Sequence, residues 1–551
     1  MTILQKLEQD LGHRVSAGRE GDYQCNVAFS LAKESGRKPI DVANEIAAKF
    51  KSDIATVSVS GAGFLNFHIK DDALSHFGQE IMKTGRLSMP VVDKKTFMFD
   101  YGAPNIGKEL HVGHLRSPII GEALKRVAEA LGHKTIADNY LGDWGLPMGL
   151  ILAELELAGR IVDGKLVGEV TLDTLNEFYP RASVRKSEDP EFKMRAEQIT
   201  IRIQSHSKPW HELWKQIRAV SVAKIKENYD LMGCTFDTYN GESYSWKYVA
   251  TVLAHLQEQG LTYMDKDCLL MDVKEDTDTG PMPPVILKKG NGGDLYATSD
   301  IATIWYRHHD YAPDEFIYVV DQRQSLHFNQ LFRVVKKGGI VPESTKLTHV
   351  GYGTINGTDG KPFKTRAGGT IKLEEVFNIL TDAAKKRLQE SGRNVDDETA
   401  RKIGLAALKF ADLQNTIRKD YQLDIDKFTS FEGKTGPYLL YTIARINSIL
   451  GKGDLTLPEV VNVSDVTRPI FIAMLRLVDS FATALQNYTL NGIVDAVFNL
   501  SQEFNNFYAT TNILREADAS KRNSYLVLCQ IVKNAITFAL DKLAIETVDK
   551  M

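Results

Sequence analysis

Residues 96–145 of this 551-residue chain read TFMFDYGAPNIGKELHVGHLRSPIIGEALKRVAEALGHKTIADNYLGDWG and predict a strand, a loop, a helix and a second strand. Residues 97–99 form a short apolar run that is typical of a buried strand. Four aliphatic residues then recur at helical spacing: Ile120, Leu124, Val127 and Leu131. Gly132 stands where the helix should end, and an extended pattern resumes at 134–137. Such a crossover builds a parallel sheet, which binds ligands at the carboxyl ends of its strands.

Two histidines and a glycine stand at the entrance to the predicted helix, as His111, Gly113 and His114. The free amide groups of a helix N-terminus attract anions, imidazoles add hydrogen-bond donors, and a glycine lets a flat ligand approach the backbone. These are the features that a binding site for a nucleoside triphosphate requires. Two histidines three apart also suit helix capping or an adventitious metal ion, so the motif alone leaves these alternatives open.

Composition describes an ordinary soluble protein, with 43% hydrophobic and 25% charged residues. The chain is too long for a single core, which predicts three or more domains. Lys and Arg total 67 against 71 Asp and Glu, a formal net charge of -4. Overall charge therefore does not indicate a polyanionic partner, and any nucleic-acid surface must be a local patch.

Cysteine usage and the N-terminus bear on the compartment. The four cysteines form no C-x-x-C pair, which argues against a zinc site or a disulfide framework and favours a reducing compartment: Cys25, Cys234, Cys268 and Cys529. The first 15 residues lack the apolar core of a signal peptide, and no apolar run approaches the roughly 20 residues of a membrane span. We expect a cytoplasmic protein without a membrane partner.

The remaining chain divides by its periodicity. Helical segments followed by an alternating hairpin predict a separate α/β module before residue 90, and a mostly helical stretch at 150–232 carries predicted interruptions near Gly164 and Pro180. A second α/β region follows, with predicted strands at 285–287 and 316–320 and predicted helices at 299–307 and 326–337. The helical insertion implies that one nucleotide-binding sheet is assembled from halves distant in sequence.

Residues 351–370, GYGTINGTDGKPFKTRAGGT, are rich in glycine and carry Lys361, Lys364 and Arg366. Flexible backbone with clustered cations is typical of a phosphate-binding loop, although the spacing is not that of a P-loop. A polar hairpin tip with lysines has the same composition, so that alternative stays open. Beyond residue 373 strand signals become rare, which predicts an all-α region.

Together these features resemble the arginyl-tRNA synthetase family of class I aminoacyl-tRNA synthetases. The string His111–His114 is similar to the family's HIGH sequence, and Lys361–Thr365 occupies the place of its KMSKS loop with only the K-x-x-K-[ST] skeleton. Four further strings support the resemblance, which covers nearly the whole chain: Ala103–Asn105 with Lys108, Gly142–Gly145, Tyr296–Asp300 and Phe431–Tyr438.

The resemblance implies an α/β fold with three parts. These are an N-terminal α/β module contacting the tRNA elbow (1–90), a Rossmann-like parallel-sheet catalytic domain (91–372) with its helical insertion at about 150–232, and an all-α helical bundle that binds the anticodon (373–551). It also implies that the enzyme attaches L-arginine to its tRNA through an arginyl-adenylate. ATP is a substrate and Mg²⁺ accompanies it, with no protein-bound structural metal expected. We expect a monomer.

The resemblance implies roles for individual residues. The predicted catalytic residues are His111, His114, Lys364, Lys361 and Lys108, and the predicted ATP-binding residues are His111, Gly113, His114 and Lys364. A guanidinium is a planar fork that carboxylates match best. The predicted arginine-binding residues are Asn105, Glu242, Tyr296, Asp300 and Gln324, with Gln322 as the alternative register for the last. The predicted tRNA-binding residues are Tyr438, Tyr441 and Arg445.

Two other functions remain open at this stage. One is a different nucleotidyl-transferring enzyme that acts on a small metabolite, against which the long helical C-terminal region speaks. The other is a non-catalytic RNA-binding paralogue. Intact His111, His114, Lys364 and Asp300 argue against it, since a binding module does not require all four.

Overall fold

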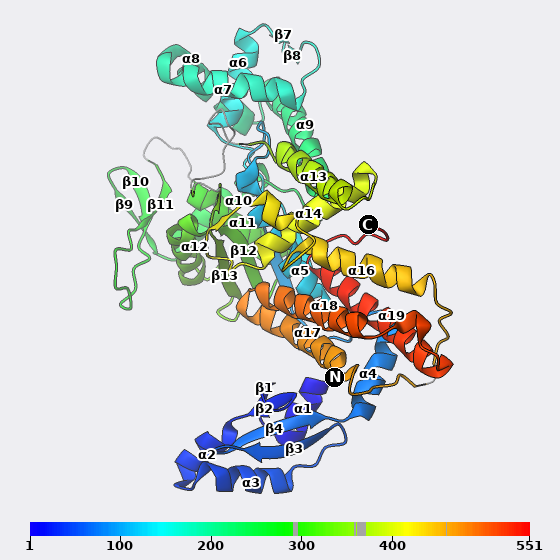
Figure 1. Ribbon diagram of the computed structural model, residues 1–551. Helices are drawn as coiled ribbons and strands as arrows, with labels where there is room; N and C mark the ends of the chain where they lie inside the picture. Colours follow the sequence, from blue (N-terminus) through cyan, green and yellow to red (C-terminus); the bar gives the residue numbers. More distant parts are fainter. Residues whose placement is uncertain (290–295, 358–359, 361–370, 459) are drawn as a thin grey trace.

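The computed structural model describes residues 1–289, 296–357, 360, 371–458 and 460–551 (Figure 1). An N-terminal module lies at one end of the molecule and a helical insertion at the other, with the central sheet and the C-terminal helices between them. The arrangement confirms the predicted combination of a parallel-sheet domain, an α/β module and a helical C-terminal region.

The N-terminal module is built on an antiparallel sheet of strand order β1-β2-β4-β3. Its first helix begins with a capping box, because the Thr2 hydroxyl accepts a hydrogen bond from the Gln5 N–H while the Gln5 side chain accepts one from the Thr2 N–H. The predicted hairpin is confirmed as β3 and β4. The elements are α1 (Ile3–Leu11), β1 (Ser16–Ala17), β2 (Tyr23–Cys25), α2 (Val27–Ser35), α3 (Pro39–Lys49), β3 (Ala55–Ser60), β4 (Phe64–Ile69) and α4 (Asp71–Thr84).

A four-stranded parallel sheet of order β13-β12-β5-β6 forms the centre of the molecule. Its strands are β5 (Thr96–Asp100), β6 (Lys134–Asp138), β12 (Glu315–Asp321) and β13 (Lys346–Tyr352). The crossover from β5 to β6 runs through α5 (Arg116–Ala130), as the apolar spacing predicted. Because β5 pairs directly with β12, the sheet does combine halves that are distant in sequence.

The insertion after β6 is largely helical. It contains α6 (Leu146–Leu157), β7 (Ile161–Val162), β8 (Lys165–Leu166), α7 (Leu172–Glu188), α8 (Pro190–Gln204) and α9 (Trp210–Leu231). The predicted interruption at Gly164 is confirmed as the β7–β8 turn. The predicted interruption at Pro180 is wrong, because α7 continues through this exposed proline, held by the buried residues Phe178 and Ala182 on either side of it. The break comes at Asp189, whose side chain caps α8.

A second α/β segment leads back to the central sheet. It contains α10 (Glu242–Glu258), β9 (Thr262–Asp265), β10 (Cys268–Met271), β11 (Val285–Lys288), α11 (Tyr296–Tyr311) and α12 (Ser325–Lys337). The predicted strand at 285–287 is confirmed, but it joins an antiparallel sheet of order β11-β10-β9 and not the parallel sheet. Both predicted helices and the buried strand β12 are confirmed.

The C-terminal region is helical apart from β15 (Tyr421–Gln422), which pairs with β14 (Ile355–Asn356). Its helices are α13 (Leu373–Glu390), α14 (Asp397–Leu413), α15 (Ile425–Phe428), α16 (Gly436–Leu450), α17 (Arg468–Asn487), α18 (Asn491–Thr510) and α19 (Ala519–Lys542). Within the part of the chain that the structure describes, α17 alone is long and apolar enough to cross a membrane, and 56% of its most apolar window is buried inside the fold.

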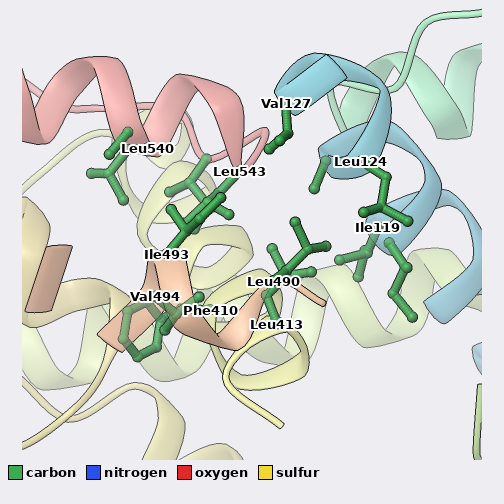
Figure 2. Close-up of a cluster of buried hydrophobic side chains, with 14 of the residues drawn as sticks. Ile119, Leu124, Val127, Phe410, Leu413, Leu490, Ile493, Val494, Leu540 and Leu543 are labelled. Carbon is green, nitrogen blue, oxygen red and sulfur yellow. The ribbon is translucent and has the colours of Figure 1, made fainter. Parts of the chain in front are cut away.

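Helix α5 packs between the sheet and the C-terminal helices. Figure 2 shows Ile119, Leu124 and Val127 of α5 in one apolar cluster with residues of the C-terminal region: Phe410, Leu413, Leu490, Ile493, Val494, Leu540 and Leu543. Each of these side chains is buried. Helix α5, which begins directly after the turn that carries His111 and His114, therefore contacts both the parallel sheet and the C-terminal helices.

Candidate active site

Three segments that carry predicted site residues follow the carboxyl ends of parallel strands. The histidine turn (residues 111–114) comes after β5, and the predicted ligand Gln324 follows β12. The lysine-bearing stretch (residues 361–370) comes after β13 in sequence. Since parallel strands end at one edge of a sheet, these three segments leave the same edge.

The histidine turn is a short 3-10 helix (Val112–His114) that leads into α5. The Gly113 N–H donates to His111 Nδ1 at 3.1 Å, and the His111 N–H donates to His114 Nδ1 at 3.1 Å. The two ring centroids lie 4.0 Å apart. A ring whose Nδ1 accepts a hydrogen bond carries its proton on Nε2, so each neutral imidazole keeps an Nε2–H donor.

Both histidines are held in the neutral form. Burial lowers the pKa of His114 to about 3, and the neighbouring charges of His111 and Lys108 lower it as well. The pKa of His111 is also lowered, first by burial and then by Lys108. Neutral imidazoles can hydrogen-bond phosphate oxygens, while positive charge comes from the lysines.

Gly113 and Lys108 have distinct places beside the rings. A Cβ atom on the exposed Gly113 would lie 2.9 Å from His111 Cε1, so a side chain there would displace the ring. Lys108 Nζ lies 4.3 Å from the centroid of the Tyr179 ring on α7, which holds this cation next to the histidine turn.

Three predicted site residues are not fully described. Lys361 and Lys364 lie outside the described residues. Tyr296 is described only by its backbone, at the first position of α11, and its side chain lies outside the described part as well.

The chain that follows the stretch 361–370 is hydrogen-bonded to the histidine turn. The Val112 N–H donates to Ile371 O at 3.1 Å, and His111 and Lys372 form an antiparallel β-bridge. The Lys372 ammonium also pairs with Glu109 at 2.7 Å. Ile371 and Lys372, which follow the lysine-bearing stretch in sequence, therefore lie directly beside the two histidines.

The chain before this stretch is held by Arg116, the first residue of α5. Arg116 lies two residues after His114, and its Nη1 donates to Gly353 O at 2.8 Å and to Lys419 O at 3.0 Å. The segment 111–116 therefore contacts the chain at Gly353, before the lysine-bearing stretch, and at Ile371, after it. Arg116 was not predicted from the sequence, because its partners lie more than 200 residues away.

An acidic cluster (Asp143, Glu242 and Asp300) lies at the sheet edge. Burial raises the pKa of Glu242 to about 8, and the negative charges of Asp143 and Asp300 raise it further, while the Trp144 N–H donates to its carboxylate. The pKa of the half-buried Tyr140 is also raised, first by burial and then by the charges of Asp300 and Glu242. The structure therefore brings together two of the predicted arginine ligands.

Asp143 already has its own cation. Its Oδ2 lies 2.7 Å from Arg218 Nε, and its Oδ1 accepts the Ser243 N–H at 2.9 Å. A Cβ atom on Gly241 would lie 2.5 Å from this carboxylate, so the backbone before α10 approaches it closely. Asp143 is thus paired with Arg218, whereas neither Glu242 nor Asp300 has a lysine or arginine partner among the described residues, so these two acids are the ones available to an incoming cation.

A buried ion triad fixes α11 to the sheet. Arg307 Nη1 lies 2.7 Å from Asp100 Oδ2 at the end of β5, and Arg307 Nη2 lies 2.7 Å from Asp138 Oδ2 at the end of β6. All three residues are buried. Asp300 lies two turns before Arg307 on the same helix, so the triad places Asp300 at the edge from which the histidine turn departs.

Asn105 and Gln324 are exposed. Asn105 forms a parallel β-bridge with Gly142, where a Cβ atom would lie 2.0 Å from Asn105 Oδ1. Gln324 ends a short 3-10 helix (Gln322–Gln324) in which Gln322 is exposed as well. Both residues therefore stay predicted ligands, and the register between the two glutamines stays open.

The predicted tRNA-binding residues lie on α16. The Arg445 guanidinium carbon is 4.9 Å from the Tyr441 ring centroid and 4.9 Å from that of Tyr508. Tyr438 packs against Phe498, with 5.3 Å between ring centroids, and its hydroxyl accepts a hydrogen bond from Asn505 at 2.8 Å. The structure thus brings Tyr441 and Arg445 together and packs Tyr438 against α18.

His327 is a further contact of the site that was not predicted from the sequence. Its Nε2 lies 2.7 Å from Asp300 Oδ2. The residue is in the first turn of α12, and no sequence motif links it to α11. Its only signal is its position three residues after Gln324, on the same helical turn.

Comparisons with known proteins match each part of the chain. Family models match residues 8–69 ("Arginyl tRNA synthetase N terminal domain"), 77–425 ("tRNA synthetases class I (R), catalytic domain") and 439–551 ("DALR anticodon binding domain"). The arginine–tRNA ligase of Alkaliphilus oremlandii is 40% identical over 550 residues, covering 96% of this chain and 94% of the relative. That of Francisella tularensis is 34% identical and covers 100% of this chain and 98% of the relative.

Solved structures agree in fold. The arginyl-tRNA synthetase of Thermus thermophilus superposes with a TM-score of 0.83 at 24% identity, covering 100% of both chains. That of Plasmodium falciparum gives 0.82 at 24% identity, covering 98% of this chain and 95% of that one. The family models and the full-length relatives show that this chain belongs to the arginyl-tRNA synthetase family, class I enzymes that charge tRNA with arginine through an aminoacyl-adenylate.

Proposed function

We propose that the histidine turn, the lysine-bearing stretch 361–370 and the acidic cluster form one active site, in which this chain activates L-arginine with ATP and transfers it to tRNA. The observation that carries the proposal is the pairing of His111 with Lys372, a residue that follows the lysine-bearing stretch closely in sequence. The acidic cluster lies at the same sheet edge, where a small cationic amino acid can meet the triphosphate.

In the first step an arginine carboxylate oxygen attacks the α-phosphorus of ATP. The bond from that phosphorus to the bridging oxygen breaks, pyrophosphate leaves with the electron pair, and arginyl-adenylate remains. The Nε2–H groups of His111 and His114 donate to phosphate oxygens as charge moves onto them, and Gly113 leaves room for the adenine. Lys364, Lys361 and Lys108 neutralise the departing pyrophosphate. No enzyme nucleophile takes part, so catalysis consists of positioning and charge stabilisation.

The guanidinium binds to Asp300 and Glu242, with the ring of Tyr296 as a flat partner. Five N–H donors in a rigid fork can bridge two carboxylates, which a lysine ammonium matches less well. Glu242 holds its proton more strongly than a free carboxylic acid when the site is empty, and the arriving cation favours its ionised form. Asn105 and Gln324 hold the α-amino and α-carboxylate groups.

In the second step a hydroxyl of the terminal tRNA ribose attacks the acyl carbon, the bond to the phosphate oxygen breaks, and AMP leaves. Residues 1–90 contact the tRNA elbow and residues 373–551 the anticodon, while residues 91–372 carry the chemistry. Tyr441 and Arg445 form a stacking and phosphate contact, and Tyr438 supports them. Binding at both ends depends on salt, since phosphate contacts dominate it.

Mg²⁺ enters with ATP, because that ion needs few protein ligands when substrate phosphates supply oxygens. The protein acts as a monomer in the cytoplasm, consistent with a chain whose four cysteines are all free thiols.

The test is a charging assay with purified tRNA and each standard amino acid in turn, together with ATP–pyrophosphate exchange. We expect transfer of arginine alone. Exchange at background level would favour a non-catalytic RNA-binding paralogue. Nucleotidyl transfer to a small metabolite, with no acceptance by tRNA, would favour a different enzyme built on the same sheet.

A further inference from the structure

Asp300 meets a histidine from a neighbouring helix. His327 Nε2 on α12 donates to Asp300 Oδ2 on α11 at 2.7 Å. Both side chains are partly buried, with 29% of His327 and 25% of Asp300 exposed. A small ligand can therefore reach the Asp300 carboxylate, while water contacts only part of it.

The imidazole itself is held by its neighbours. Its ring meets the Phe328 ring with 5.4 Å between centroids, and Phe328 is stacked on His349 at 4.5 Å and contacts Tyr318 at 5.1 Å. Phe328 is buried, and with Leu331 it seats the apolar face of α12 in the core. The position of His327 is therefore set by packing before any ligand arrives.

The hydrogen bond is assisted by charge. Burial by itself lowers the pKa of His327, but the hydrogen bond and the negative charge of Asp300 outweigh burial and raise it overall. The imidazolium is thus favoured beside this carboxylate. A neutral ring protonated on Nε2 makes the same hydrogen bond, so the contact with Asp300 does not require the charged form.

We propose that His327 is a positioning residue that fixes the orientation of the Asp300 carboxylate for the arginine guanidinium. The inference rests on the role proposed above for Asp300. An aspartate on a helix surface samples several rotamers, and a ligand that requires one of them must order the side chain on binding. With Oδ2 held by His327, that ordering is complete before arginine binds.

The test measures steady-state aminoacylation with His327→Ala and His327→Gln. We expect His327→Ala to raise the KM for arginine about tenfold, which corresponds to ordering one side chain, with kcat and the KM for ATP changed less than about twofold. Glutamine offers an N–H donor at a similar reach, so His327→Gln should restore the KM for arginine to within about threefold of the original. A KM for arginine that stays unchanged in His327→Ala overturns the proposal.

A matched control separates orientation from packing. His349 stacks on the same Phe328 ring but donates to Val320 O at 3.0 Å, so it contacts the same neighbour without touching Asp300. We expect His349→Ala to leave the KM for arginine within about twofold, with a melting temperature close to that of His327→Ala. An equal rise of KM in both variants means that α12 packing is the cause and contradicts the proposal.

The Asp300→Asn variant separates this inference from the proposed function. If Asp300→Asn leaves the KM for arginine unchanged, the proposed guanidinium site is wrong and the role of His327 falls with it. If Asp300→Asn raises that KM and His327→Ala does not, the site stands and the positioning role is wrong. We expect both variants to raise it, and we expect His327→Ala to add less than about twofold in the Asp300→Asn background, since the residue to be oriented is already altered.

Discussion

Arg116 and Asp412 form a buried ion pair between the helix that follows the histidine turn and helix α14 of the C-terminal region. Arg116 Nε lies 3.1 Å from Asp412 Oδ2, and both side chains are almost fully inaccessible. The Tyr421 hydroxyl donates to the same carboxylate at 3.0 Å. Because Arg116 also donates to Gly353 O and Lys419 O, one guanidinium joins α5, the chain before the lysine-bearing stretch and the link to the C-terminal helices.

Breaking this pair should destabilise the whole protein. Arg116→Met leaves Asp412 buried without its counter-charge, with only the Tyr421 hydroxyl bound to it, and such losses cost about 3–5 kcal/mol. We expect a clear fall in the melting temperature. Arg181→Ala is the matched control, since its ion pair with Glu177 is exposed and should contribute less than about 1 kcal/mol. Equal melting temperatures in the two variants would contradict the structural role of the buried pair.

His114→Ala and Lys364→Ala should each slow aminoacylation by about a hundredfold. Each removes a contact to phosphate charge that develops in the transition state, and one such contact is worth about 3 kcal/mol, or roughly a hundredfold in rate. Pyrophosphate exchange measures the activation step, and filter binding measures tRNA affinity, which should stay within about twofold. A large loss of tRNA affinity in either variant would count against the assigned roles.

Gly113→Ala should slow activation without unfolding the protein. The added Cβ meets the His111 ring at 2.9 Å and forces it from the position in which it accepts the Gly113 N–H. We expect the activation rate to fall by about tenfold or more, since the displaced ring weakens one such phosphate contact. Gly492→Ala is the control, because nothing lies within 4 Å of its Cβ position. Activation at the original rate in Gly113→Ala would mean that His111 does not need this orientation.

Arginine binding should depend on pH through Glu242. Its pKa is about 8 in the empty site, raised by burial and by Asp143 and Asp300. The guanidinium binds the ionised carboxylate, so protons compete with arginine below that pKa and the KM for arginine should fall as pH rises toward 8, then level off. Steady-state kinetics between about pH 6 and 9 measure this. His327 is a second titratable group at the site, so the pH dependence must be compared with that of Glu242→Gln. The KM of this variant for arginine should be higher and should change less with pH. An unchanged slope in Glu242→Gln would show that another group causes it.

Local periodicity was sufficient to predict most of the central domain. The apolar run at 97–99 and the helical spacing from Ile120 predicted β5 and α5, because a strand and a helix bury different sequence patterns. Pro180 was misleading, since tertiary packing holds α7 through an exposed proline.

Contacts between distant segments could not be predicted from one sequence. Arg116 meets Asp412 across 296 positions, and nothing local marks the pair. His327 and Asp300 come from separate helices that are joined through β12, and their hydrogen bond depends on how α11 and α12 pack. The acids Asp300 and Glu242 were predicted from a resemblance. The ion pairs that support them, Arg307 with Asp100 and Asp138 and Arg218 with Asp143, could be identified only once the fold was known.

A crystal structure with bound arginine and a non-hydrolysable ATP analogue tests the central claim most directly, namely that the histidine turn and the lysine-bearing stretch act on one triphosphate. The account predicts phosphate oxygens within hydrogen-bond distance of His111 Nε2, His114 Nε2 and Lys364 Nζ, with the guanidinium between Asp300 and Glu242. A triphosphate bound away from the histidines, or a Lys364 ammonium that does not reach it, would contradict the account.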